Sequence, residues 1–265
     1  MKRPGIAVFD SGLGGLTVLR ALRGQLPKED FFYFADTRFL PYGDRPEVFL
    51  KERGVLIAKA LVARGAKALV IACNTATAAA AEEIRAAIEV PVVAMEPGVK
   101  PAAALSQSGR IGVMATTRTV SSPRFQRLLD NHASHVQVLA QACPGLAEAI
   151  EMHGPESAEV ATLLDCFVAP LNAAGVDVVA LGCTHYPWVT EEIARRLPPG
   201  VQLLDTGEAI ARQLERMLTA GHLLGGGNGQ LQLATSGAAL MVKATVERLW
   251  GQHCGEHLPV EHWEP

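Results

Sequence analysis

Two cysteines of this chain end two similar apolar segments. Cys73 stands in segment 65–75 and Cys183 in segment 175–185, which lies 110 positions further along. Both segments read as a buried strand that ends in cysteine and continues into polar residues. Two similar thiols placed by a duplication suit a reaction that is approached from two opposite faces. Proton transfer at a stereocentre is the chemistry that needs such a pair.

The duplicated context separates these two cysteines from the other three. A cysteine after an apolar strand is usually a small buried hydrophobic residue, and we interpret Cys143, Cys166 and Cys254 in this way. Cys73 and Cys183 each precede a predicted helix start, and a helix N-terminus lowers the thiol pKa from its usual value of about 8.5. One cysteine as thiolate and the other as thiol could therefore take a proton from one face and return one to the other.

Two further side chains stand beside these strand ends. Asp10 ends the first predicted strand, where a carboxylate either caps a turn or orients and assists Cys73. His185 follows Cys183 by two residues, and its usual pKa of about 6.5 lets it act as general acid or base in support of a thiol. A purely structural histidine is the alternative, and the position beside the duplicated cysteine favours catalysis.

Short apolar strands that alternate with longer helices must position these residues. Strands are predicted at 6–9, 31–35, 68–72, 111–114, 136–140, 178–181, 201–204 and 230–234. Runs that are apolar throughout and do not alternate suit strands buried on both faces, and this pattern favours an α/β fold with mostly parallel sheets. Helices are predicted at 48–64, 158–174 and 238–250, the last after the glycine-rich segment 225–229.

The duplication also divides the chain into two pseudo-symmetric domains. Segment 6–11 resembles segment 111–116, so two strand ends are repeated in the same order. We place residues 1–97 with 208–265 in the first α/β domain and residues 98–207 in the second. Ligands of open α/β sheets bind beyond the carboxyl ends of strands, so the active site is expected in the cleft between the domains.

Composition and motifs exclude several classes of protein. The net charge is −3 over 265 residues and no block of like charge appears. The sequence therefore shows no basic patch that would bind nucleic acid or an anionic membrane surface. No run approaches transmembrane length, and the apolar stretch near the start is too short for a signal peptide. Five widely spaced cysteines argue against a disulfide framework and a zinc site, and in favour of the cytoplasm.

Cofactor motifs are also missing from the sequence. The glycine-rich segment 11–17 fails the nucleotide-binding pattern because Thr17 takes the place of its third glycine, so we interpret the segment as a donor-rich turn suited to a carboxylate. The histidines form no metal-binding pair, and no lysine lies at a duplicated strand end, where a pyridoxal-phosphate racemase would need one. We expect an enzyme without cofactor or metal.

Seven motifs resemble those of the glutamate racemase family, within the cofactor-independent aspartate/glutamate racemase superfamily. They lie in order at 10–15, 41–43, 72–76, 96–98, 116–119, 142–144 and 182–187. The resemblance implies interconversion of L- and D-glutamate for bacterial peptidoglycan synthesis, and hence for cell-wall biogenesis and cell shape. It also implies that Cys73 serves D-glutamate with help from Asp10, and that Cys183 serves L-glutamate with help from His185.

The resemblance further implies an acidic helper and a set of substrate contacts. Glu151 matches the helper on the Cys183 side, with Glu148 as its rival, because segment 145–148 departs from the family pattern. The implied substrate-binding residues are Asp10, Ser11, Tyr42, Gly43, Asn74, Thr75, Thr116, Thr119, Thr184 and His185.

Two other functions stay open at this stage. A sister racemase of aspartate or a hydantoin would differ in the pocket for the substrate side chain, which the sequence does not reveal. An amino-acid-binding regulator without catalysis is the second alternative, although binding alone needs no thiols. For partners we expect a small-molecule substrate, glutamate, with neither nucleic acid nor membrane, and the sequence is compatible with a homodimer.

Overall fold

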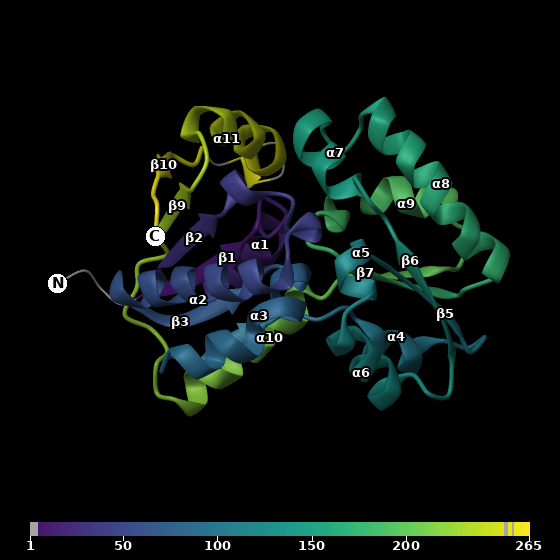
Figure 1. Ribbon diagram of the computed structural model, residues 1–265, viewed down its shortest axis with the longest axis horizontal. Helices are drawn as coiled ribbons and strands as arrows, with labels where there is room; N and C mark the ends of the chain where they lie inside the picture. Colours follow the sequence, from purple (N-terminus) through teal and green to yellow (C-terminus); the bar gives the residue numbers. More distant parts are fainter. Residues whose placement is uncertain (1–4, 252–253, 256) are drawn as a thin grey trace. The chain divides into compact units, whose positions relative to one another are not determined.

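The computed structural model describes residues 5–251, 254–255 and 257–265, and it forms two α/β units (Figure 1). Unit 1 runs to Met95 and resumes at Gly207, and unit 2 comprises Glu96–Thr206. The predicted domain boundaries lie within two residues of these divisions. The prediction of an α/β fold with parallel sheets in two domains is confirmed.

The sheet of unit 1 has six strands, all parallel, in the order β10-β9-β2-β1-β3-β4. Its central strands are nearly continuous apolar runs, and β1 is buried at every position after Gly5. Such strands need helices on both faces of the sheet. The strands are β1 (Gly5–Asp10), β2 (Phe31–Ala35), β3 (Ala66–Ile71), β4 (Val92–Ala94), β9 (Leu231–Thr235) and β10 (Val260–His262).

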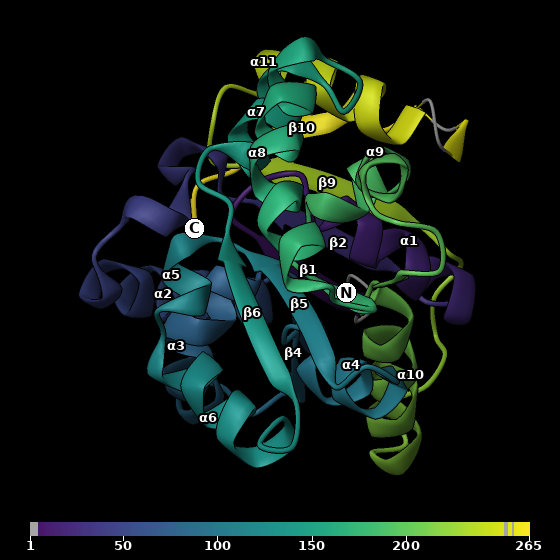
Figure 2. The same cartoon turned by 90° about the vertical axis from the view of Figure 1, so that its right-hand side faces the viewer.

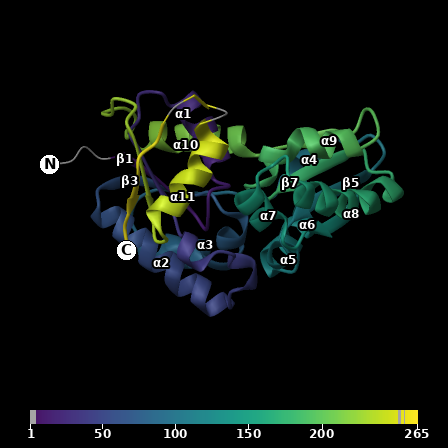
Figure 3. The same cartoon turned by 90° about the horizontal axis from the view of Figure 1, so that it is seen from above.

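Helices cover both faces of this sheet (Figure 3). One face carries α2 and α3, whose Ile57 and Ile84 share a core cluster with Phe9 and Ile71. The other face carries α1 and α10, which lie against each other. The helices of unit 1 are α1 (Leu16–Gln25), α2 (Glu47–Ala63), α3 (Asn74–Ala87), α10 (Gly207–Ala220) and α11 (Ala239–Val246).

Unit 2 has a smaller parallel sheet in the order β6-β5-β7-β8. In Figure 2, α4 and α6 lie below this sheet and α7, α8 and α9 lie above it. The strands are β5 (Arg110–Ala115), β6 (Gln137–Ala142), β7 (Val178–Gly182) and β8 (Gln202–Leu204). The helices are α4 (Val99–Leu105), α5 (Thr117–Val120), α6 (Pro123–His132), α7 (Leu146–His153), α8 (Ala158–Ala174) and α9 (Thr190–Arg196).

The duplicated segments occupy equivalent places in the two sheets. The run β2-β1-β3-β4 in unit 1 matches the run β6-β5-β7-β8 in unit 2. In each run the chain first moves to one side of the central strand and then to the other, so the strand order reverses beside β1 and beside β5. In open α/β sheets, ligands bind beyond the carboxyl ends of the strands beside such a reversal.

Three local features of the structure differ from what the sequence predicted. The helix predicted at 238–250 ends at Val246 and continues as a π-helical turn over Glu247–Gly251. Strand β10 was not predicted, because it has only three residues and two are exposed. The helix start expected after Cys183 is a 3-10 turn, Tyr186–Val189, and the α-helix α9 begins only at Thr190. None of the helices in the described ranges is both long and apolar enough to span a membrane.

Candidate active site

Cys73 follows the carboxyl end of β3 and caps the amino end of α3. The backbone amide of Ala76 donates to its Sγ atom at 3.3 Å, and the Ser11 hydroxyl lies 3.5 Å from the same sulfur. The residue is only 5% exposed. An amide donor and the positive end of a helix dipole both favour a thiolate over a thiol, so this position suits a general base.

Asp10 closes β1, the neighbour of β3, and is fully buried. Its carboxylate accepts hydrogen bonds from the backbone amides of Ser11 at 2.7 Å and Gly15 at 2.5 Å. A Cβ atom at position 15 would come within 2.9 Å of Asp10 Oδ2, so glycine permits this close approach. The donor-rich turn that was predicted to suit a ligand carboxylate therefore directs two of its amides to the protein's own carboxylate.

Tyr42 occupies a 3-10 turn, Tyr42–Asp44, in the segment between β2 and α2. Its hydroxyl donates to Asp36 Oδ2 at 2.5 Å. Burial and the negative charge of Asp36 raise the pKa of Tyr42 well above its ordinary value, so the hydroxyl keeps its proton. Because that proton is directed at Asp36, any donation from Tyr42 to substrate has to come from its main chain.

Asn74 and Thr75 start α3 directly after Cys73, and both are buried. The side-chain oxygen and nitrogen of Asn74 have no hydrogen-bond partner among the described residues. A buried amide without partners costs free energy, which a ligand at this strand end would recover. The structure therefore supports Asn74 as a ligand contact more directly than the sequence could.

The second thiol has a different environment, which is built from a histidine and a glutamate. Cys183 follows β7, and its Sγ atom lies 3.7 Å from Nδ1 of His185. The Nε2 atom of His185 lies 2.6 Å from Oε1 of Glu151, which comes from α7. All three residues are at least nine-tenths buried. Glu151, and not its rival Glu148, is thus the acid whose carboxylate contacts the histidine.

The charge state of His185 follows from these contacts. Burial acts to lower the pKa of His185, but the hydrogen bonds to Cys183 and Glu151 and the negative charge of Glu151 raise it well above its ordinary value. The imidazole therefore carries a proton near neutral pH, and it can stabilise a thiolate on Cys183 or pass that thiolate a proton.

This ion pair predicts a pH-dependent contribution to stability. Because the pKa of His185 is raised on folding, the pair stabilises the protein fully below the unfolded value of about 6.5 and loses this contribution as pH rises through the folded pKa. We expect Glu151→Gln to lower the free energy of unfolding by about 3 kcal/mol near pH 6 and by less near pH 10. Urea unfolding at both pH values measures the difference. Glu148→Gln, on the same helix, is the control, and a loss for Glu151→Gln that is constant or larger at the higher pH would contradict the assignment.

The remaining predicted residues of unit 2 lie at the ends of β5 and β7. Thr116 caps α5, with its hydroxyl 2.9 Å from that of Thr119 and accepting from the Thr119 amide at 3.3 Å. Thr184, directly after Cys183, is 3% exposed. Cys143 lies beside this group, but burial raises its pKa to about 12, so it stays a neutral thiol, in agreement with its interpretation as a buried hydrophobic residue. The same interpretation is wrong for Cys166, which is exposed.

Two residues that contact the predicted site were missed in the sequence. Tyr33 donates to Gly12 O at 2.8 Å and lies 3.3 Å from Asp10 Oδ2. Asp36 accepts the Tyr42 proton and follows β2 just as Asp10 ends β1. The signal for Asp36 was present, because a carboxylate directly after a buried strand had already singled out Asp10.

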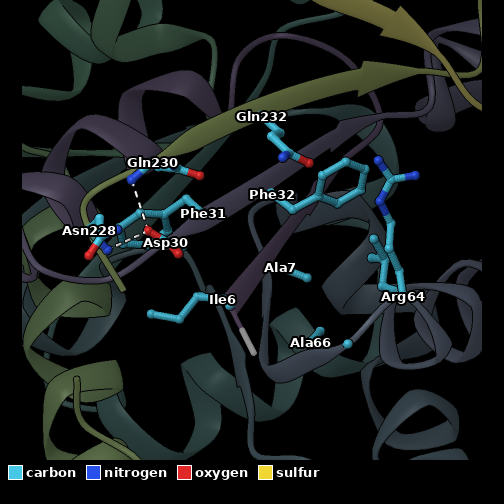
Figure 4. Close-up of a pocket in the computed structure, with 13 residues that line it drawn as sticks. Ile6, Ala7, Asp30, Phe31, Phe32, Arg64, Ala66, Asn228, Gln230 and Gln232 are labelled. Carbon is cyan, nitrogen blue, oxygen red and sulfur yellow. Dashed lines mark hydrogen bonds between the residues drawn. The ribbon is translucent and has the colours of Figure 1, made fainter. Parts of the chain in front are cut away.

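A cavity of about 330 Å³ lies elsewhere in unit 1 (Figure 4). Its walls come from the amino ends of β1, β2, β3 and β9, with Ile6, Phe31 and Ala66 among the lining residues. Since Asp10 and Cys73 stand at the opposite ends of these parallel strands, this cavity is separate from the candidate active site.

The part of the chain that the structure describes also holds no cluster of three or more His, Cys, Asp or Glu residues able to bind a metal ion.

Fold and site together define a class of protein. Two doubly wound sheets each carry a buried cysteine at the point where the strand order reverses, and each thiol has its own hydrogen-bonding partners. Cysteine is one of the side chains that enzymes use as general acid or base, so this fold with its two thiols is that of a candidate enzyme of proton transfer.

Comparison with known proteins identifies the family. Residues 51–214 match the sequence model of the family described as Asp/Glu/Hydantoin racemase. The glutamate racemase of Pseudomonas aeruginosa strain PAO1 is 48% identical over 251 residues, which are 93% of this chain and 94% of that protein. The chain therefore belongs to the Asp/Glu/hydantoin racemase family, and it is a racemase, an isomerase. The resemblance in its motifs is confirmed.

Solved structures agree with this placement. A glutamate racemase of Bacillus anthracis aligns with a TM-score of 0.88 at 30% identity, covering 100% of this chain and 98% of that one. The Escherichia coli glutamate racemase, solved in complex with L-glutamate and the activator UDP-MurNAc-ala, aligns with a TM-score of 0.86 at 30% identity and covers 98% of this chain and 97% of that one.

Proposed function

We propose that this protein interconverts L- and D-glutamate by proton transfer at Cα, with Cys73 acting on one face of the substrate and Cys183 on the other. The observation that carries the proposal is that two thiols occupy equivalent strand ends, each with its own stabilising groups. Relatives that match nearly the whole chain are glutamate racemases, which supports glutamate as the substrate.

The two thiols exchange roles with the direction of reaction. From D-glutamate, the Cys73 thiolate takes the α-proton and becomes a thiol, while the Cys183 thiol gives its proton to the other face and becomes a thiolate. The donor from Ala76 favours the starting thiolate, and the His185 cation stabilises the thiolate that forms. The reverse reaction begins with Cys183 as the thiolate, and exchange of protons with solvent resets the pair.

Polar groups around the thiols would hold the substrate. The unpartnered Asn74 amide and the buried Thr75 lie beside Cys73, and the buried Thr184 follows Cys183. Ser11, Gly43, Thr116 and Thr119 complete the proposed contacts, with Tyr42 contributing its main chain. Asp10 is proposed to assist Cys73, and His185 with Glu151 to assist Cys183.

Circular dichroism of the purified protein with L-glutamate tests the substrate. We expect the signal to decay to zero as the racemic mixture forms, and to change far more slowly with L-aspartate. Faster decay with L-aspartate would show a sister racemase, and no decay with either amino acid would favour a binding protein without catalysis.

We further propose a role in bacterial peptidoglycan synthesis and a cytoplasmic location, where the thiols stay reduced. A homodimer stays a prediction.

The proposed mechanism needs no cofactor, because the chain's own thiols supply both the base and the acid. Dialysis against a chelator and treatment with hydroxylamine, which removes pyridoxal phosphate, are each expected to leave activity intact. Iodoacetamide is expected to inactivate the protein, and glutamate to protect it. Using Cys166→Ala as the starting protein removes an exposed thiol that would otherwise react. Loss of activity that metal or pyridoxal phosphate restores would contradict the prediction.

A further inference from the structure

Residues 36–45, which we call the Tyr42 loop, connect β2 to α2 and carry the proposed contacts Tyr42 and Gly43. The start of the loop is tied to β9. The Thr37 hydroxyl lies 2.6 Å from that of Thr235, and the Arg38 amide donates to the Ser236 hydroxyl at 3.2 Å. Two short 3-10 turns are the regular structure of the loop, so these side-chain contacts hold it in place.

Arg53 holds the loop from the helix side. It projects from the middle of α2, and its Nε and Nη2 atoms donate to the two carboxylate oxygens of Asp36 at 2.9 and 2.7 Å. The same guanidinium lies 4.6 Å from the centre of the Phe39 ring. Arg53 is 8% exposed and Asp36 is fully buried. One side chain of a long helix thus contacts both the first residue and the middle of the loop.

Asp36 passes this restraint on to Tyr42. The carboxylate oxygen that accepts from Arg53 Nε also accepts the Tyr42 hydroxyl. The Tyr42 ring lies edge-on to Phe9 at 6.3 Å, within the core cluster that contains Cys73. Tyr42 is therefore fixed at both ends, by Asp36 at its hydroxyl and by the core around its ring, and the main chain of Tyr42 and Gly43 is fixed with it.

Stability alone does not account for this ion pair. Burying two charges has a large desolvation cost, and well-packed apolar residues in their place are often equally or more stable. A fork of two charge-assisted hydrogen bonds does, however, set the position of its partners narrowly. Groups that bind a ligand need such support, since they must be held within about 0.5 Å of the productive geometry.

We infer that Arg53 and Asp36 are positioning residues, which hold the main chain of Tyr42 and Gly43 in the geometry that binds the substrate. The inference rests on the proposed function, since it assigns substrate binding to the Tyr42 loop. It predicts an effect on binding more than on the chemical step, because neither side chain reaches the reacting thiol in the contacts described. A group that binds substrate and transition state equally changes KM and leaves kcat unaltered.

The first test replaces Arg53 by methionine, which keeps an unbranched apolar stem and removes the guanidinium with its charge. We expect Arg53→Met to raise the KM for glutamate about tenfold in both directions, with kcat changed less than about threefold. Lys67→Met is the matched control, because Lys67 also forms a buried ion pair, 2.6 Å from Glu29, but at the opposite ends of the same strands. The control is expected to lose thermal stability to a similar degree and to keep the wild-type KM.

Four outcomes of this test are informative. A KM for Arg53→Met no higher than that of Lys67→Met would overturn the inference, as would a fall in kcat with an unchanged KM. If the methionine variant does not fold, Arg53→Lys replaces it, because lysine keeps the charge but cannot form the fork. Its KM is then expected to rise about threefold. Wild-type protein that does not racemise glutamate would instead refute the proposed function, which separates the two failures.

A double-mutant cycle tests whether Arg53 acts through Asp36 and Tyr42. Tyr42→Phe removes only the hydroxyl that Asp36 holds, and we expect it to raise KM by itself. Since both side chains act on the same carboxylate, Arg53→Met in the Tyr42→Phe background is expected to add less than about twofold to KM. Increases that multiply in the double variant would show that Arg53 acts independently of Tyr42, and would overturn the inference.

Discussion

Cys73→Ala and Cys183→Ala are each expected to lower kcat for glutamate racemisation by about a thousandfold or more, in both directions. In the proposed mechanism each thiol is the one proton carrier on its face of the substrate, so losing either stops the exchange. The reaction is followed by circular dichroism from L-glutamate and from D-glutamate. Because both positions are strand-end residues at the edge of the core, the variants are expected to keep the wild-type far-ultraviolet spectrum.

The control for these variants is Cys166→Ala, in which an exposed thiol of α8 is removed and activity is expected to stay at the wild-type level. Near-normal turnover in either Cys73→Ala or Cys183→Ala would refute the mechanism of two thiols. Heavy water gives an independent measurement. Deuterium is expected in the product enantiomer well before it appears in recovered substrate, and rapid labelling of the substrate would show that one base serves both faces.

Substitution of the two helpers is expected to slow the reaction by about a hundredfold and to move the primary isotope effects in opposite directions. The equilibrium constant between enantiomers is one, so kcat/KM is equal in the two directions for every variant and cannot show which helper serves which cysteine. Asp10→Asn is expected to make the Cys73 step more rate-limiting. The isotope effect on kcat/KM should then rise for α-deuterated D-glutamate and fall for α-deuterated L-glutamate.

His185→Asn is expected to do the reverse, because His185 contacts Cys183. The two variants serve as controls for each other, since each removes one ionisable side chain from the strand ends of one unit. If both substitutions shift the two isotope effects in the same sense, neither helper belongs to one thiol. Asp10 and His185 would then be better described as general binding groups.

The two thiols are supported by different physical means. The Cys73 sulfur is contacted by a main-chain amide and by the Ser11 hydroxyl. The Cys183 sulfur is contacted instead by a histidine that a buried glutamate keeps protonated. Amide donors do not titrate, but an imidazole does. The Cys183 step is therefore expected to be the one that weakens as pH rises through the raised pKa of His185.

The sequence by itself determined the fold class and the elements that carry the thiols. The apolar runs around Ile6, Phe31 and Val178 have no alternation, so they had to be strands covered on both faces. Helix α8 has the bounds that were predicted, Ala158–Ala174, and in the structure Ser157 caps its start while Gly175, with φ of 63°, ends it. The duplication also placed Cys73 and Cys183 at the carboxyl ends of equivalent strands.

Contacts between residues far apart in the sequence were decided only by the tertiary structure. The spacing could not choose between Glu148 and Glu151, because the choice depends on which side of α7 faces His185. It also could not show that the glycine-rich turn surrounds Asp10, or that Asp36 connects Arg53 to Tyr42. Periodicity reports which residues are buried, since burial repeats along a helix or strand. The partner that a buried polar group meets is set by the packing of separate elements, and for that the chain must fold.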